Sequence, residues 1–282
     1  MAGQYSESAR RTPIRARGLE RLLSGDVTLA WGLLFSAWAI VFLAAIGGDG
    51  RCLYYDPLTE HPSWAIGLSL VTFVAGWLIM AAAMMLPASL PLIQLFARVM
   101  REQNVRLWQP LVLLFVAAYL VVWSLFALVT FIGDFGLHRI VESQPWLNQH
   151  SSWFAGVALL VAGGFQFSEL KEQCLRVCRH PFAFLTQYYG RGAKATWDLG
   201  VRHGLHCLGC CWALMLVMFA VGVVHLTGML VLTAVMAIEK TSTWGRPLVP
   251  LVGTALLVWG GWTLLWPDTA TTIFTSSRCL SR

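Results

Sequence analysis

Two histidines and three cysteines fall within nine consecutive positions of the sequence, from His203 to Cys211. On a helix, His203 and Cys207 lie one turn apart. Cys210 and Cys211 follow Cys207 by three and four residues, so these four side chains share one helical face, whereas His206 lies off it. Such a group is costly in an apolar helix unless something binds to it. The cluster therefore predicts a metal site or a thiol redox site.

A second pair of cysteines, Cys174 and Cys178, has the four-residue spacing of one helical turn. On a continuous helix both thiols share a face and can complete a site begun by Cys207. Thiolate and thioether ligands favour Cu(I), whereas cysteine and histidine without methionine suit Zn(II) equally well. Copper is therefore the first expected metal and zinc the second. Each cysteine taken alone can also be a small buried hydrophobe.

Methionine and glutamate side chains extend this candidate site. Met84 and Met85 lie in an apolar segment, where thioethers either bind soft metals or fill gaps in the core. Glu239 closes another apolar segment, where a carboxylate is either functional or neutralised by a neighbour such as Lys240 or Arg202. The predicted metal ligands are Cys174, Cys178, His203, Cys207, Cys210, Cys211, Met84, Met85 and Glu239.

The amino-acid composition indicates the class of protein in which these candidate ligands lie. Of the 282 residues, 57% are hydrophobic and only 12% are charged, and the mean hydropathy is +0.64. This balance is that of an integral membrane protein rather than a soluble domain. The surplus of six positive charges is explained by membrane topology, so a nucleic-acid partner is not expected. We expect a cytoplasmic N-terminal segment (1–25), one transmembrane domain (26–267) and a C-terminal tail (268–282).

Seven apolar stretches approach the length of roughly 20 residues that a helix needs to cross a bilayer. The sequence thus predicts an all-α, polytopic membrane helix bundle with about seven transmembrane helices. The predicted spans are 27–46, 65–86, 109–132, 153–169, 204–224, 227–243 and 248–266.

The distribution of lysine and arginine predicts the orientation of these spans. With the N-terminus in the cytoplasm, sixteen of the 20 basic residues fall in cytoplasmic segments and four in outer segments. The cysteines from 174 to 211 then lie near the cytoplasmic face, where thiols stay reduced.

Two prolines, Pro87 and Pro91, interrupt the second apolar stretch. A proline removes a backbone donor and clashes with the preceding turn, so the helix should be kinked or broken there. Carbonyl groups near Ala83 and Met84 are then free for water, a side chain or an ion.

The chain resembles a bacterial family of predicted metal-binding integral membrane proteins that share a domain of unknown function. The matching features cover roughly residues 70 to 245, and the block from Arg202 to Met215 is the most specific. The resemblance implies metal binding in the bacterial inner (plasma) membrane, without supplying a reaction. The chain departs from the family pattern at Ser168-Glu169, in place of Thr-Pro, and at His206, in place of an aromatic residue. The other matching residues are Trp77, Met80, Met84, Met85, Pro87, Pro91, Gln166, Leu170, Lys171, Cys174, Cys178, Arg179, Pro181, Glu239 and Lys240.

Three functions fit these features. The first is copper handling, by transport or by delivery to a partner membrane or copper protein. The second is a membrane oxidoreductase whose thiols, such as Cys207 with Cys210 or Cys211, exchange electrons. The third is a subunit of a membrane complex with a structural metal. The sequence contains no Walker phosphate loop, G-x-S-x-G or H-E-x-x-H motif, and it leaves the oligomeric state open.

Overall fold

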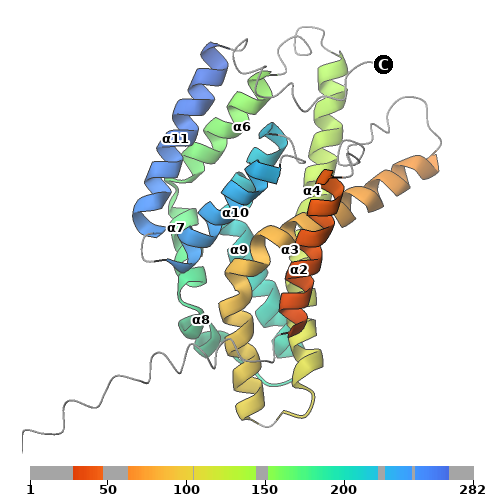
Figure 1. The fold of residues 1–282 in the computed structure, drawn as a ribbon, viewed down its shortest axis with the longest axis vertical. Helices are drawn as coiled ribbons and strands as arrows, with labels where there is room; N and C mark the ends of the chain where they lie inside the picture. Colours follow the sequence, from red (N-terminus) through yellow and green to blue (C-terminus); the bar gives the residue numbers. More distant parts are fainter. Residues whose placement is uncertain are drawn as a thin grey trace, which may run out of the picture.

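The computed structural model describes residues 28–46, 63–103, 105–143, 152–221, 226–242 and 245–266. Every regular element in these ranges is an α-helix, which confirms the all-α prediction for this part of the chain. The predicted N-terminal segment and C-terminal tail lie outside the described residues, so the orientation stays a prediction. The helices are α2 (Thr28–Ile46), α3 (Ser63–Glu102), α4 (Trp108–Ser143), α6 (Ser152–Phe165), α7 (Glu169–Arg179), α8 (Pro181–Tyr188), α9 (Ala193–Val221), α10 (Leu226–Thr241) and α11 (Gly245–Leu265) (Figure 1).

The prediction of seven transmembrane helices is not confirmed. Within the described ranges, four helices are long and apolar enough to cross a membrane, and a fifth span results if α6 and α7 are counted together across their 65° bend. α6 has only 14 residues and α10 only 16, which is short for a bilayer crossing at 1.5 Å per residue. The four long spans are Gly67–Glu102, Trp108–Gly133, Ala193–Met218 and Gly245–Leu265.

The outward faces of the long helices are apolar. Val129 of α4 exposes 64% of its surface, and Leu251 and Val258 of α11 each expose 66%. Large apolar side chains facing outward on several helices are what a bundle surrounded by lipid requires, and they would be unusual over this extent on a soluble monomer. The described helices are therefore consistent with a membrane protein.

α3 contains both interrupting prolines and changes direction along its length (Figure 1). Pro87 has no N–H to donate to the carbonyl of Ala83, four residues earlier. The indole Nε1 of Trp38, on α2, donates to that carbonyl oxygen instead, at 3.0 Å. The prediction of a freed carbonyl near Ala83 is confirmed, and a side chain from the neighbouring helix satisfies it.

α9 lies at the centre of the bundle and packs against α4, α6 and α7. Two glycines one turn apart let α4 approach closely. A Cβ atom on Gly200 would lie 2.6 Å from the carbonyl oxygen of Phe115, and one on Gly204 would lie 2.9 Å from a methyl group of Val122. Small residues at such a spacing allow close helix contact in membranes. The α4–α9 contact fixes the face of α9 that carries the cysteines.

Candidate metal centre

The cluster from His203 to Cys211 lies in the middle of α9 rather than at its start. The helix begins at Ala193, before the predicted start at residue 204. The prediction began too late because the first turns carry the charged residues Lys194, Asp198 and Arg202, which a hydropathy profile does not include in an apolar span. Cys207, Cys210 and Cys211 each expose only 1% of their surface. The thiols are therefore inside the bundle, and their neighbours are side chains of other helices.

Three sulfur atoms from two helices surround the ammonium group of Lys240, which comes from α10. Lys240 Nζ lies 3.1 Å from Cys207 Sγ, 3.7 Å from Met85 Sδ and 3.9 Å from Cys211 Sγ. Cys211 Sγ lies 3.5 Å from Met85 Sδ, and the Tyr119 hydroxyl lies 3.3 Å from Cys207 Sγ. Two cysteines of α9 and a methionine of α3 thus form one compact group around a cation. We call Cys207, Cys211 and Met85 the sulfur triad.

His203 is buried on the same face of α9. Its hydrogen bond and ring contacts are made with residues outside the sulfur triad. Its Nε2 atom lies 3.1 Å from Ser89 Oγ on α3. Its ring stacks on the rings of Phe115 and Tyr119, with centroid distances of 5.9 and 5.6 Å, and a third ring, that of Phe184, lies 5.9 Å away. These contacts hold the imidazole in one orientation beside the triad, and its role as a metal ligand stays a prediction.

The two cysteines of α7 face α9 at a second point. Cys174 packs on Gly209, where an added Cβ would lie 2.6 Å from Cys174 Sγ, and the Cys178 thiol interacts with the Cys210 thiol. α7 is a separate helix because the chain turns after α6, and the Ser168 side chain accepts a hydrogen bond from Lys171 N at its first turn. The cysteines of α7 and α9 are thus brought together, as the sequence suggests. Cys178 is the more exposed member of the pair.

Glu239 is engaged by side chains of the α6–α7 region rather than by Lys240 or Arg202. Its Oε2 atom lies 2.8 Å from Lys171 Nζ, and both side chains are almost fully buried. Gln166 Nε2 donates to Oε1 at 3.4 Å, and Arg179 Nε donates to the Glu239 backbone oxygen at 2.8 Å. Consecutive residues of a helix point in different directions, so Lys240 faces the sulfur triad while Glu239 faces Lys171.

Sequence reasoning missed Tyr119 as a member of the site and did not pair Lys240 with the cysteines. It treated Lys240 as a neighbour that neutralises Glu239 and as part of the family pattern, although helical spacing already indicates that the Lys240 and Glu239 side chains diverge. Tyr119 lies in an apolar stretch without any motif, so no sequence signal identifies it. Met84 is fully buried in the core around the triad.

The donor atoms favour a soft monovalent metal over zinc. Within the described ranges, no three histidine, cysteine, aspartate or glutamate side chains converge closely enough to hold a metal ion. A zinc site needs about four such ligands in tetrahedral geometry, so zinc is not supported. The sulfur triad consists of two thiols and a thioether, which is the ligand chemistry that selects Cu(I).

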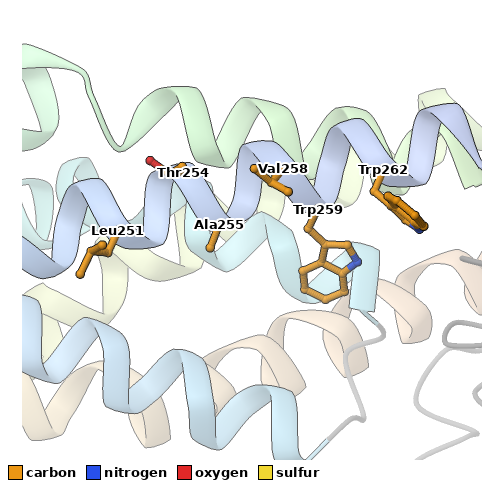
Figure 2. A pocket seen from close by; sticks show the side chains of 6 residues that line it. All are labelled: Leu251, Thr254, Ala255, Val258, Trp259 and Trp262. Atoms are coloured by element: carbon orange, nitrogen blue, oxygen red, sulfur yellow. The ribbon is translucent and has the colours of Figure 1, made fainter.

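An open groove on α11 lies apart from these ligands. It has a volume of about 570 Å³, and all six lining side chains come from α11 (Figure 2). They are apolar apart from Thr254, whose hydroxyl donates to the Pro250 carbonyl within the same helix. The groove carries none of the predicted ligands and has the character of a lipid-facing surface. Its lining residues are Leu251, Thr254, Ala255, Val258, Trp259 and Trp262.

The fold and the site define a helical bundle in which apolar helices, four of them in the described ranges long enough to cross a membrane, enclose a buried group of sulfur side chains. A family model described as PpoB2, copper chaperone, matches residues 74–263. Because the match covers more than half of the chain, the protein belongs to this copper chaperone family. The match supports the metal-binding part of the family resemblance and narrows the metal to copper. No curated protein and no solved structure matches the chain.

Proposed function

We propose that this protein is a membrane-embedded copper chaperone that binds Cu(I) at the sulfur triad and delivers it to a copper protein. Copper is the cargo of this site. The observation that carries the proposal is the convergence of Cys207, Cys211 and Met85, from two helices, within 3.9 Å of one cationic group. Two thiols and a thioether that lie together supply the soft ligands that Cu(I) prefers.

The burial of the triad supports chaperone chemistry over general thiol chemistry. A Cu(I) ion exposed to water is readily oxidised or lost to competing ligands, and a buried site excludes both. Cys210 and Cys211 each direct their thiol to the carbonyl oxygen of Cys207, at 3.0 and 2.8 Å. Cys211 Sγ also lies 3.5 Å from Met85 Sδ, so these sulfur atoms already lie together before a metal binds and the triad is preorganised. A preorganised site lowers the cost of binding.

Release of copper to a partner requires a route from the triad to the surface. Cys178 supports such a route, because its thiol interacts with Cys210 and is only half-buried. Thiolates exchange Cu(I) by stepwise ligand replacement, so a series of thiols from the interior to the surface suits delivery better than a closed structural site. In this proposal the copper-protein partner docks near the end of α7.

Changing Cys207 and Cys211 together to serine is expected to abolish copper retention. A serine hydroxyl is a hard ligand of similar size, so the fold is kept while the affinity for Cu(I) falls. The measurement is the copper content of protein purified anaerobically in detergent, loaded with Cu(I) and desalted. The wild type should retain about one copper ion per chain.

The double variant Cys52→Ser/Cys279→Ser is the matched control, since neither cysteine belongs to the predicted metal set. It should retain copper as the wild type does. A wild-type protein without bound copper, or a Cys207/Cys211 variant with undiminished copper content, would overturn the proposal.

A further inference from the structure

Every methionine in the described residues is buried. Met80, Met84, Met85, Met100, Met215, Met218, Met229 and Met236 each expose 3% of their surface or less. On the same helices, other apolar side chains point outward: Leu205 of α9 exposes 55% and Val231 of α10 exposes 56%. In the part of the chain that the structure describes, thioethers are thus confined to the interior, and the exposed apolar side chains are aliphatic or aromatic.

Six of these methionines continue the sulfur triad along three helices. On α9, Met215 and Met218 follow Cys211 by four and seven residues, which extends the face that carries Cys207 and Cys211. On α10, Met236 and Met229 precede Lys240 by four and eleven residues, on the same face. On α3, Met84 and Met80 precede Met85.

The directions of the helices place these thioethers on one side of the triad. α9 runs away from α8, and α10 runs back so that its end lies near α7 (Figure 1). The end of α3 lies near α8 (Figure 1). The contacts of Met85 and Lys240 with Cys211 set the three helices in register. Residues after Cys211 on α9 and residues before Lys240 or Met85 therefore occupy the same half of the bundle. Met100 lies near the opposite end of α3.

We propose that these six methionines form a thioether path along which Cu(I) moves between the sulfur triad and the far side of the bundle. The inference rests on the proposed function, because the triad is one end of the path. Thioethers are uncharged soft ligands, so they accept a monovalent soft cation without exchanging protons. They also bind it less strongly than thiolates, which suits transient steps along a path.

Methionine also fills irregular gaps in cores, and packing alone would bury it. Packing and metal contact differ in one observable, which is whether a soft cation reaches the sulfur atoms. Ag(I) is the suitable probe, because it has the charge and ligand preference of Cu(I) and does not cycle between oxidation states. The methyl group next to each sulfur reports coordination directly.

The test is NMR of the full-length protein in detergent with ¹³C-methyl-labelled methionine, titrated with Ag(I). Assignments come from single Met→Leu variants, which keep apolar volume and remove the sulfur. The first equivalent should shift the Met85 methyl resonance. Further equivalents should shift the resonances of Met215, Met218 and Met236 and leave that of Met100 unchanged.

The variant Met215→Leu/Met218→Leu should bind the first equivalent as the wild type does and lose the later ones. Met100→Leu is the matched control and should lose none. The path is overturned if the Met215 and Met218 resonances stay fixed to saturation, or if Met100 shifts equally. Failure of the proposed function is a separate result: the first equivalent is then absent, or it persists in Cys207→Ser/Cys211→Ser.

Discussion

Replacing Lys171 with methionine is expected to lower the free energy of unfolding by about 3–5 kcal/mol, the usual cost of breaking a buried ion pair by removing one partner. Lys171 Nζ lies 2.8 Å from Glu239 Oε2, with side-chain exposures of 1% and 3%. Among the residues that the structure describes, Gln166 then makes the one remaining contact with the carboxylate, at 3.4 Å. The measurement is denaturant unfolding in detergent micelles.

Two controls separate the buried charge from other effects of the substitution. The double variant Lys171→Met/Glu239→Gln removes both charges and should recover most of the lost stability, because no ion is left unpaired. On the same helix, Arg176 pairs with Glu172 at 4.0 Å, and both side chains are more than half exposed. Arg176→Met should therefore change stability by only about 0.5 kcal/mol or less. Equal losses for Lys171→Met and Arg176→Met would contradict the account of this ion pair.

Replacing Lys240 with leucine is expected to weaken Cu(I) binding by about 100-fold, which corresponds to roughly 3 kcal/mol. Cu(I) held by the thiolates of Cys207 and Cys211 carries a net negative charge inside the bundle. The ammonium of Lys240, within 3.9 Å of every triad sulfur, neutralises that charge. A buried charge without a partner is costly, so its loss should lower the affinity.

The measurement for Lys240→Leu is competition for Cu(I) with a chromophoric chelator under anaerobic conditions. Lys240→Arg keeps the positive charge and should retain most of the affinity, although the bulkier guanidinium must rearrange. If Lys240→Leu binds copper as tightly as the wild type or more tightly, Lys240 is a competitor of the metal or a bystander rather than its counter-charge.

The ligand side chains could be predicted from the sequence because their spacing is local. Cys207 and Cys211 are one turn apart, and this alone places both thiols on one face of any helix. The kink also followed from a local rule, since Pro87 cannot bond to the carbonyl of Ala83. In both cases the relevant geometry is contained within a few residues of one helix.

The partners of those ligands depended on long-range packing. The pairing of Lys171 with Glu239 requires the 65° bend between α6 and α7, which no hydropathy profile contains. The number of spans is not confirmed for a related reason. Hydropathy marks apolar stretches, but α9 begins at Ala193, before its apolar part, and α6 ends after 14 residues at a turn. The position of Lys240 could be predicted in part. Helical geometry alone indicates that the Lys240 and Glu239 side chains point in different directions, but not that Lys240 contacts Cys207.

X-ray absorption at the copper edge tests the central claim most directly, because it reports which atoms surround the bound ion. For the Cu(I)-loaded wild type we expect a first shell of sulfur only, from Cys207, Cys211 and Met85. In Cys207→Ser/Cys211→Ser this sulfur shell should disappear together with the bound copper. A wild-type shell of nitrogen or oxygen ligands, or a sulfur shell that persists in the variant, would contradict the assignment of copper to this triad.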